Sequence, residues 1–459
     1  MANHTDDILT RFNHGITWNG ITYLMYKVLT TSVTFLLFAR LSTNNFVTWT
    51  SLQSLVYLII LWLDGGLRKS IPRYLPLFEQ HAHALERRIR LFFLLYACVL
   101  ASAAFLFFWF SPRIANFLHI TYNHHVFIIA SILICLEGTV ALLRLIFHAQ
   151  FKNKIFNVMS TLVLAAQAGT IIILIISHWP ITLLQIFLLQ AAASCIIIFF
   201  SFRLLAKNQA LPLTSTELPP RLVRSFFIHS GIMWMNTSIK SLSERNVMVP
   251  LIAHILGPTS AALYKIAQDS ALLVHRLIVK TLGTNDTSLL TYSTHHADSI
   301  TLLPINFNKL AHKVIILCTP LLGLLLLGFI AVHSSGNFWL LWFFSIPPSH
   351  SFEQVSALFF ILTAGYLCET LFSPFERILE VQHQYKRLFI AYTPYILVLV
   401  WLVSVNPVWL NNIILFVGVL QAVRLISALL MVLLVNKTYQ RAFPWKTLAK
   451  YLVYMGGCL

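Results

Sequence analysis

Stretches of about 20 mostly apolar residues recur along the chain, and no other feature constrains the fold as strongly. A membrane-spanning helix needs about 20 such residues. We predict twelve spans, at residues 20–40, 47–64, 89–110, 126–147, 156–178, 182–203, 225–253, 260–280, 309–333, 353–375, 387–405 and 412–435. Only 10% of the residues are charged, whereas a soluble domain averages about a quarter. The sequence therefore predicts an all-α polytopic membrane protein and argues against a soluble enzyme.

The basic residues predict the orientation of these spans. Cytoplasmic loops collect Lys and Arg. With the N-terminus placed inside, the predicted inner segments hold 23 of the 32 Lys and Arg residues, and the outer segments hold only Arg40 and Arg113. We therefore expect a multi-pass protein of the cytoplasmic membrane with both termini in the cytoplasm.

The spans divide into two sets of six. The stretch around residues 204–224 combines Pro, Ser, Thr and charge, as a linker does. We predict an N-terminal six-helix lobe at 1–203, the linker at 204–224, a C-terminal six-helix lobe at 225–435 and a basic tail at 436–459. Two six-span halves have the same orientation, so any repeat between them is parallel. The tail is expected to lie on the anionic inner leaflet or to pack as a short helix.

Charged residues inside the spans carry the functional signal, because a charge at mid-bilayer costs about 2.5–3.5 kcal/mol on insertion scales. The acidic ones are Glu137, Glu244, Asp269 and Glu369. The basic ones are Lys27, Arg144, Lys240, Arg245, Lys265, Arg276 and Arg424. Helical spacing places many of these residues in polar stripes on otherwise apolar helices. We expect the stripes to face a shared central cavity that is cationic on balance.

Ion pairing is the alternative explanation for the same charges. Lys240 with Glu244 and Lys265 with Asp269 are four residues apart and can neutralise one another. Glu137 can pair with Arg144, and Arg424 with Glu369 of the tenth span. Arg144 and Arg276 lie near predicted cytoplasmic ends, where long side chains reach the headgroups. A binding role is favoured for Lys27, Lys240 and Lys265.

Motifs for catalysis, metals and nucleic acids are lacking. The six Cys residues are scattered, and the His pairs have no ligand spacing around them. No nucleotide-binding, nucleophile or metalloprotease motif occurs in the sequence. We therefore expect no metal, no cofactor, no nucleic-acid partner and no enzymatic activity.

Four local segments resemble one family. They are LLFARLSTNNFVTWTSLQSL at 36–55, LDGGLRKSIPRYLP at 63–76, SERNVMVPLIAHILGPTSAALYKIAQ at 243–268 and PFERILEVQHQYKRL at 374–388. They are similar to the multidrug/oligosaccharidyl-lipid/polysaccharide (MOP) exporter superfamily, above all to its O-antigen-type polysaccharide flippases. In the third segment Gly257 and Tyr264 match the family hairpin. Ala262 stands where the family has its second Gly, and Glu244 is nearest to its acidic position.

The resemblance implies a flippase that moves a polyprenyl-pyrophosphate-linked oligosaccharide across the membrane by alternating access. Lys27, Lys240 and Lys265 would neutralise the pyrophosphate, with Arg245, Arg276, Arg144 and Arg424 as further cavity residues. Glu244, Asp269, Glu369 and Glu137 are the candidates for ion coupling. Expected partners are the lipid-linked glycan, membrane lipids and a glycan polymerase or glycosyltransferases.

Alternatives to this flippase stay open. A drug exporter of the same superfamily would be coupled to a cation. A membrane-embedded glycosyltransferase or polymerase would also be polytopic and basic. Such enzymes need a sizeable outer loop with charged catalytic residues, but the longest predicted outer loop, about 333–352, holds no Lys, Arg, Asp or Glu. The eukaryotic branch linked to dolichol-oligosaccharide assembly also resembles the segment at 243–268.

Overall fold

The computed structural model describes residues 25–71, 82–149, 153–207, 220–273, 299–334, 350–405 and 412–458, apart from 27, 68–69, 178, 243–244 and 383. All regular secondary structure in these ranges is helical. The helices are α2 (Thr43–Leu63), α4 (Ala82–Trp109), α5 (Ser111–Phe117), α6 (His124–Ala149), α7 (Asn153–Ile176), α8 (Leu183–Lys207), α9 (Pro220–Ser241), α10 (Arg245–Leu256), α12 (Ser299–Ser334), α14 (His350–Val381), α15 (Tyr385–Val405), α16 (Ile413–Leu434), α17 (Lys437–Ala442) and α18 (Trp445–Cys458). Residues 28–40 and 258–273 are helical as well.

The predicted all-α membrane fold is confirmed. Within the described residues, eight helices are long and apolar enough to cross a membrane. Residues 94–117 add a ninth candidate, a pair of helices bent by 65° between Trp109 and Ser111. The remaining predicted spans coincide with helices at 28–40, at α9 with α10, and at 258–273. Each of the twelve predicted spans therefore overlaps a helix.

The seventh span is predicted as one continuous helix, but the structure has two helices there. The first, α9, ends at Ser241, and α10 begins at Arg245. Side chains from α2 bind α9 directly before the interruption: the Trp62 indole donates to the Ser241 hydroxyl over 3.1 Å. The Trp234 indole on α9 donates to the carbonyl oxygen of Trp62 over 2.6 Å. The interruption leaves Lys240 and Arg245 on its two sides.

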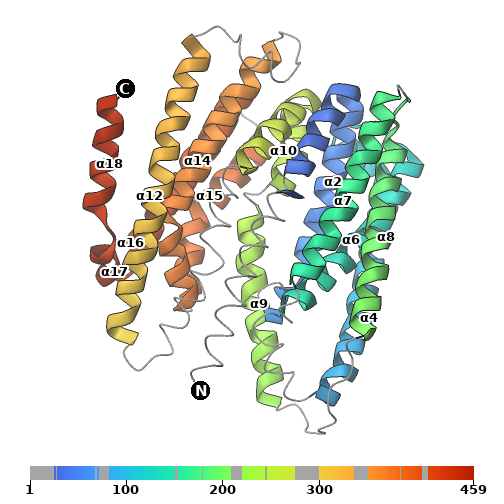
Figure 1. Ribbon diagram of the computed structural model, residues 1–459, viewed down its shortest axis with the longest axis horizontal. Coiled ribbons are helices and arrows are strands. Elements are labelled where there is room, and N and C mark those ends of the chain that lie inside the picture. The colour runs from blue at the N-terminus through green and yellow to red at the C-terminus, as the bar shows by residue number, and fades with distance from the viewer. Residues whose placement is uncertain are drawn as a thin grey trace. The chain divides into compact units, whose positions relative to one another are not determined.

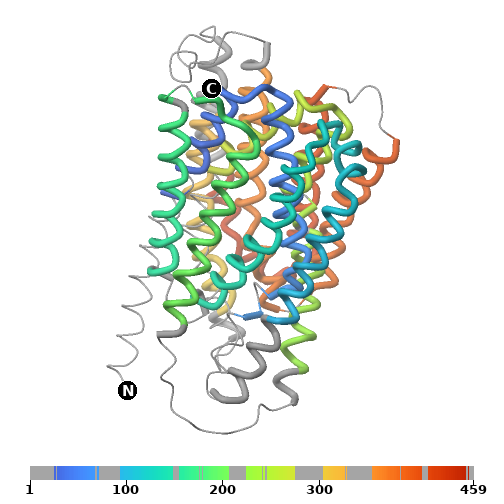
Figure 2. The backbone as a smooth tube through the Cα atoms, turned by 90° about the vertical axis from the view of Figure 1, so that its right-hand side faces the viewer, coloured from blue at the N-terminus to red at the C-terminus, as the bar shows by residue number. Residues whose placement is uncertain are grey.

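The chain forms two compact units, residues 1–262 and 263–459. In unit 1, α6 packs against α2, α4, α7 and α8, and both α9 and α10 pack against α2. In unit 2, α14 packs against α12, α15 and α16. Within each unit the long helices lie side by side (Figure 1, Figure 2). The linker residues 208–219 lie outside the described residues, so the lobes at 1–203 and 225–435 stay a prediction.

Gly66 explains how closely α2 approaches α9 in unit 1. Its φ of +79° lies in the left-handed region, which a side chain disfavours. A Cβ added there would lie 2.0 Å from the carbonyl oxygen of Ser230 on α9. Because that neighbour is backbone, it cannot move aside cheaply, and only glycine fits.

The predicted tail at 436–459 is a folded part of unit 2. The Gln440 amide donates to the carbonyl oxygens of Val432 and Val435 at the end of α16, over 2.7 and 2.9 Å. Phe443 packs against Phe375 of α14, with ring centroids 4.8 Å apart. Both α17 and α18 contact α12, and Figure 1 shows α18 beside it. The tail therefore packs as helices.

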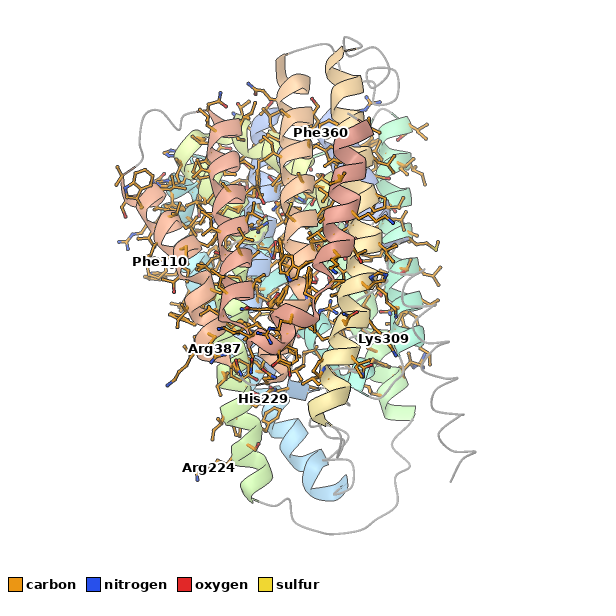
Figure 3. The ribbon with its side chains drawn as sticks, turned by 90° about the vertical axis from the view of Figure 1, so that its left-hand side faces the viewer. Phe110, Arg224, His229, Lys309, Phe360 and Arg387 are labelled. Atoms are coloured by element: carbon orange, nitrogen blue, oxygen red, sulfur yellow. The ribbon has the colours of Figure 1, made fainter. Side chains whose placement is uncertain are left out.

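Basic residues of predicted cytoplasmic segments gather toward one end of unit 2. Lys309 on α12 and Arg387 on α15 lie toward the same end, and Phe360 on α14 lies toward the other (Figure 3). The Arg387 guanidinium donates to the Leu434 carbonyl oxygen at the end of α16 over 3.0 Å. This arrangement fits the alternation of spans on which the predicted orientation depends.

Candidate functional site

Arg424 on α16 is the centre of a buried polar cluster in unit 2. Its side chain is only 9% exposed, and its guanidinium lies 3.6 Å from the Glu369 carboxylate on α14. The guanidinium carbon is 5.0 Å from the ring centroid of Tyr366 and 5.9 Å from that of Tyr395. Cation–π contacts of this kind stabilise a charge that has lost its water. The ion pair that the sequence analysis suggested between Arg424 and Glu369 of the tenth span is therefore formed.

A second ion pair lies within the helix at 258–273. The Lys265 ammonium donates to the Asp269 carboxylate, and the two side chains are only 2% and 8% exposed. A buried charge is tolerated when it is paired and hydrogen-bonded. The pair predicted from the four-residue spacing is therefore formed, and Lys265 is neutralised within its own helix.

Gln268 joins these two parts of the cluster. Its amide nitrogen donates to the hydroxyl oxygens of Tyr264, over 3.0 Å, and of Tyr366, over 2.9 Å. Tyr366 is also the ring that lies against Arg424. The helix at 258–273 is thus connected to α14 and α16 through neutral donors and aromatic rings. Such a connected network fixes the positions of its members.

Unit 1 holds a different acid, the half-buried Glu137 on α6. The Ser194 hydroxyl lies 2.8 Å from Glu137 Oε1, and the Gln190 amide nitrogen lies 3.3 Å from the same oxygen. The Gln190 amide also donates to the Tyr57 hydroxyl oxygen over 3.2 Å. Gln190 and Ser194 are buried on α8, and Tyr57 belongs to α2. Among the described residues, the side chains that hydrogen-bond to Glu137 are therefore neutral.

The suggested pair between Glu137 and Arg144 is not formed. The Arg144 side chain is exposed, and its guanidinium carbon lies 5.6 Å from the ring centroid of Phe156 on α7. This position fits the alternative in which Arg144 extends toward the end of its helix. The seven-residue spacing is compatible with a pair, but the Arg144 guanidinium lies over Phe156 instead.

The structure describes no side chain for the remaining predicted site residues. Lys27, Glu244 and Arg276 lie outside the described residues. Lys240 is the second-last residue of α9 and Arg245 the first of α10, but only their backbones are described. The backbone alone therefore places two of the predicted basic residues at the interruption of the seventh span.

The sequence analysis did not assign a role to several residues of these clusters. Gln190, Ser194 and Tyr57 surround Glu137, and Tyr366 and Tyr395 surround Arg424. Two local signals were available, since Gln190 and Ser194 are four apart, and Tyr366 is three residues before Glu369. Polar residues at helical spacing from each other share a face. In the described part of the chain, no group of three or more His, Cys, Asp or Glu side chains could hold a metal ion.

Comparison with known proteins gives a structural match alone. No family model and no curated protein matches the sequence. A solved structure of a multidrug-resistance transporter of the MATE family, within the MOP superfamily and in an inward-facing conformation, has a TM-score of 0.61 and 11% identity. The match covers 93% of this chain and 96% of the transporter. A eukaryotic MATE transporter, AtDTX14, has a TM-score of 0.47 and 11% identity over 96% and 99% of the two chains.

The match spans both units and nearly the whole of each protein, so it concerns the complete fold. At 11% identity it carries no information on substrate or site residues. The sequence alone suggested a MOP-type arrangement of membrane helices, and the solved structure supports it independently. The chain has the fold of a MATE transporter of the MOP superfamily.

Proposed function

We propose that the protein is a membrane transporter of the MOP type that moves a polyprenyl-pyrophosphate-linked oligosaccharide across the membrane. The fold supports a transporter. The observation that carries the substrate class is the surplus of basic residues within the spans, seven against four acidic ones. An anionic headgroup is the natural counter-charge for such a surplus where bulk water is excluded.

The interruption between α9 and α10 is the most suitable place for that headgroup. Lys240 and Arg245 flank the break in the seventh span. Binding sites of membrane transporters commonly form where a spanning helix is discontinuous near the midplane. Lys27 and Arg276 lie outside the described residues and stay candidates from the sequence alone. Lys265 and Arg424 have acidic partners already, so they would contribute less of the net charge.

In the proposed cycle the pyrophosphate and the sugars enter a polar cavity, and the polyprenyl chain stays in the bilayer. The cavity then opens to the other side of the membrane by alternating access. No bond is made or broken, so the protein acts as a transporter. Ion coupling would use Glu244, Asp269, Glu369 or Glu137. A glycan polymerase or glycosyltransferases would supply or consume the carried glycan.

A cation-coupled drug exporter is the second candidate, and one observation favours it. The solved structure with a TM-score of 0.61 is that of a multidrug-resistance transporter. This candidate predicts binding of cationic compounds, whereas the flippase predicts binding of an anionic lipid. The charge of the compound that the protein binds therefore separates the two functions.

Mass spectrometry of the lipids that co-purify in mild detergent tests the proposal. We expect a polyprenyl-pyrophosphate glycan with the wild-type protein and its loss from the variant that combines Lys240→Gln with Arg245→Gln. The matched control combines Lys309→Gln with Lys313→Gln on α12, which removes the same charge outside the proposed site. If only phospholipid is found, while a known glycan carrier keeps its substrate in the same preparation, the proposal is wrong. Retention of a cationic drug instead would favour the exporter.

A further inference from the structure

The two ion pairs of unit 2 differ in how accessible their acids are. The Asp269 side chain is 8% exposed and is hydrogen-bonded to the Lys265 ammonium. The Glu369 side chain is 40% exposed, and its carboxylate lies 3.6 Å from the Arg424 guanidinium. That separation is longer than a hydrogen bond between such groups. Asp269 is therefore bound firmly to its cation, whereas Glu369 contacts Arg424 loosely.

Contacts other than Glu369 also hold Arg424 in position. Its guanidinium carbon lies 5.0 Å from the ring centroid of Tyr366 and 5.9 Å from that of Tyr395. The Tyr366 hydroxyl in turn accepts from the Gln268 amide over 2.9 Å. Because the rings stay where they are, loss of the contact with Glu369 would leave the guanidinium in place.

The exposed part of Glu369 gives a polar ligand a route to this cluster. An acid within a span is tolerated where it faces water or a partner rather than lipid. Arg424 supplies only one loose contact at 3.6 Å, and a large part of the Glu369 side chain stays exposed. We therefore infer that water reaches the carboxylate, and that an anion in that water can approach Arg424 from the same direction.

Two polar side chains flank Arg424 on the same face of α16, three residues before it and three after it. The Gln421 amide oxygen and the Ser427 hydroxyl are buried, and neither makes a hydrogen bond to a residue that the structure describes. Buried polar atoms without a partner are uncommon in folded proteins. A diphosphate linked to a sugar would supply both missing partners. Its phosphate oxygens accept from a hydroxyl, and its sugar hydroxyls donate to an amide oxygen.

We propose that Glu369 is a displaceable counter-ion, which neutralises Arg424 when no substrate is bound and gives up its place to the diphosphate of the carried lipid. The identity of the anion rests on the proposed function. The exchange adds a contact in unit 2 to the one proposed at Lys240 and Arg245 in unit 1. A guanidinium forms two parallel hydrogen bonds to a phosphate, which are stronger than the contact it exchanges for them. A neutral lipid cannot replace the carboxylate, so the pair selects for an anionic headgroup.

Isothermal titration calorimetry of the purified full-length protein in mild detergent, with inorganic pyrophosphate as the probe, tests the exchange. Glu369→Gln removes the competing carboxylate. We expect it to bind pyrophosphate about fivefold more tightly than wild type, the factor that corresponds to about 1 kcal/mol for a solvent-screened ion pair. Arg424→Gln should weaken binding, and adding Glu369→Gln to it should bring no comparable gain, because Glu369 acts through Arg424. The matched control is Glu380→Gln, which removes the same charge elsewhere on α14 and should bind as wild type does.

Equal affinities of wild type and Glu369→Gln would overturn the inference. So would an equal gain in Glu380→Gln, or an undiminished gain when Arg424→Gln is already present. Glu369→Asp keeps the carboxylate, so we expect an affinity close to that of wild type. A gain as large as that of Glu369→Gln would show that the charge at this position does not compete with the anion.

Competition between lipids identifies the source of the phosphate. We expect polyprenyl pyrophosphate to displace bound pyrophosphate at lower concentrations than phosphatidylglycerol does. Displacement by both lipids at the same concentrations would assign the site to lipid phosphates in general and contradict the exchange with the carried lipid.

Transport in vesicles separates this inference from the proposed function. If wild type moves no lipid-linked glycan while Glu369→Gln still gains affinity for pyrophosphate, the proposed function fails and the counter-ion exchange stands. If wild type moves the glycan but the two affinities are equal, the exchange alone is wrong.

Discussion

Acidic side chains within the helices have different neighbours in the two units. In unit 2, Asp269 contacts the Lys265 ammonium and Glu369 contacts the Arg424 guanidinium. In unit 1, Glu137 contacts the hydroxyl of Ser194 and the amide of Gln190. A carboxylate beside a cation compensates the charge of that cation, and removing the carboxylate leaves the cation uncompensated. The acids of unit 2 therefore lie against cations, whereas the acid of unit 1 is held by neutral side chains.

The comparison predicts that the largest loss of stability follows from breaking the most buried pair. Asp269→Asn leaves the Lys265 ammonium buried without its carboxylate, which should cost about 3–5 kcal/mol. We expect a strongly lowered unfolding temperature in mild detergent. Recovery in the double variant that combines Lys265→Met with Asp269→Leu would identify the unpaired charge as the cause. If Asp269→Asn were as stable as wild type, the Asp269 carboxylate would not be needed to compensate Lys265.

A smaller loss is expected from Glu369→Gln. The Glu369 side chain is 40% exposed, so solvent screens the charge that remains on Arg424. The stacking of Arg424 against Tyr366 and Tyr395 also survives this change. We predict a destabilisation of about 1 kcal/mol, measured in the same thermal assay. A loss as large as that of Asp269→Asn would mean that the two pairs do not differ in solvent screening.

The smallest effect on stability is expected from Glu137→Gln. A glutamine side chain has nearly the shape of glutamate, and its amide oxygen can accept from Ser194 and Gln190 as Glu137 Oε1 does. We predict a change below about 1 kcal/mol, the range of one neutral hydrogen bond. Strong destabilisation would show that the negative charge of Glu137 is needed for folding, and would remove the contrast with unit 2.

The sequence predicts most of the fold because hydrophobic length is a strong signal in membranes. A span must satisfy its own backbone and present apolar side chains, so its position can be read from composition alone. The pair between Lys265 and Asp269 was also predictable, since both residues belong to one helix. The pair between Arg424 and Glu369 was identified because no acid lies on the span of Arg424.

Other features depend on tertiary contacts that the sequence does not encode locally. The end of α9 at Ser241 is associated with Trp62, which is far away in the chain. The neighbours of Glu137 come from α8 and α2, whereas the sequence offered Arg144 on its own helix. The tail at 436–459 is short and basic, and its packing depends on hydrogen bonds from Gln440 on α17 to carbonyl oxygens at the end of α16.

Reconstitution into vesicles tests the central claim most directly. The measurement is the appearance of the sugars of a polyprenyl-pyrophosphate oligosaccharide on the opposite side of the membrane, detected by an added glycosidase. We predict movement with the wild-type protein, none when Lys240→Gln and Arg245→Gln are combined, and undiminished movement when Lys309→Gln and Lys313→Gln are combined. No movement with the wild-type protein, in vesicles where a known flippase works, would contradict the account.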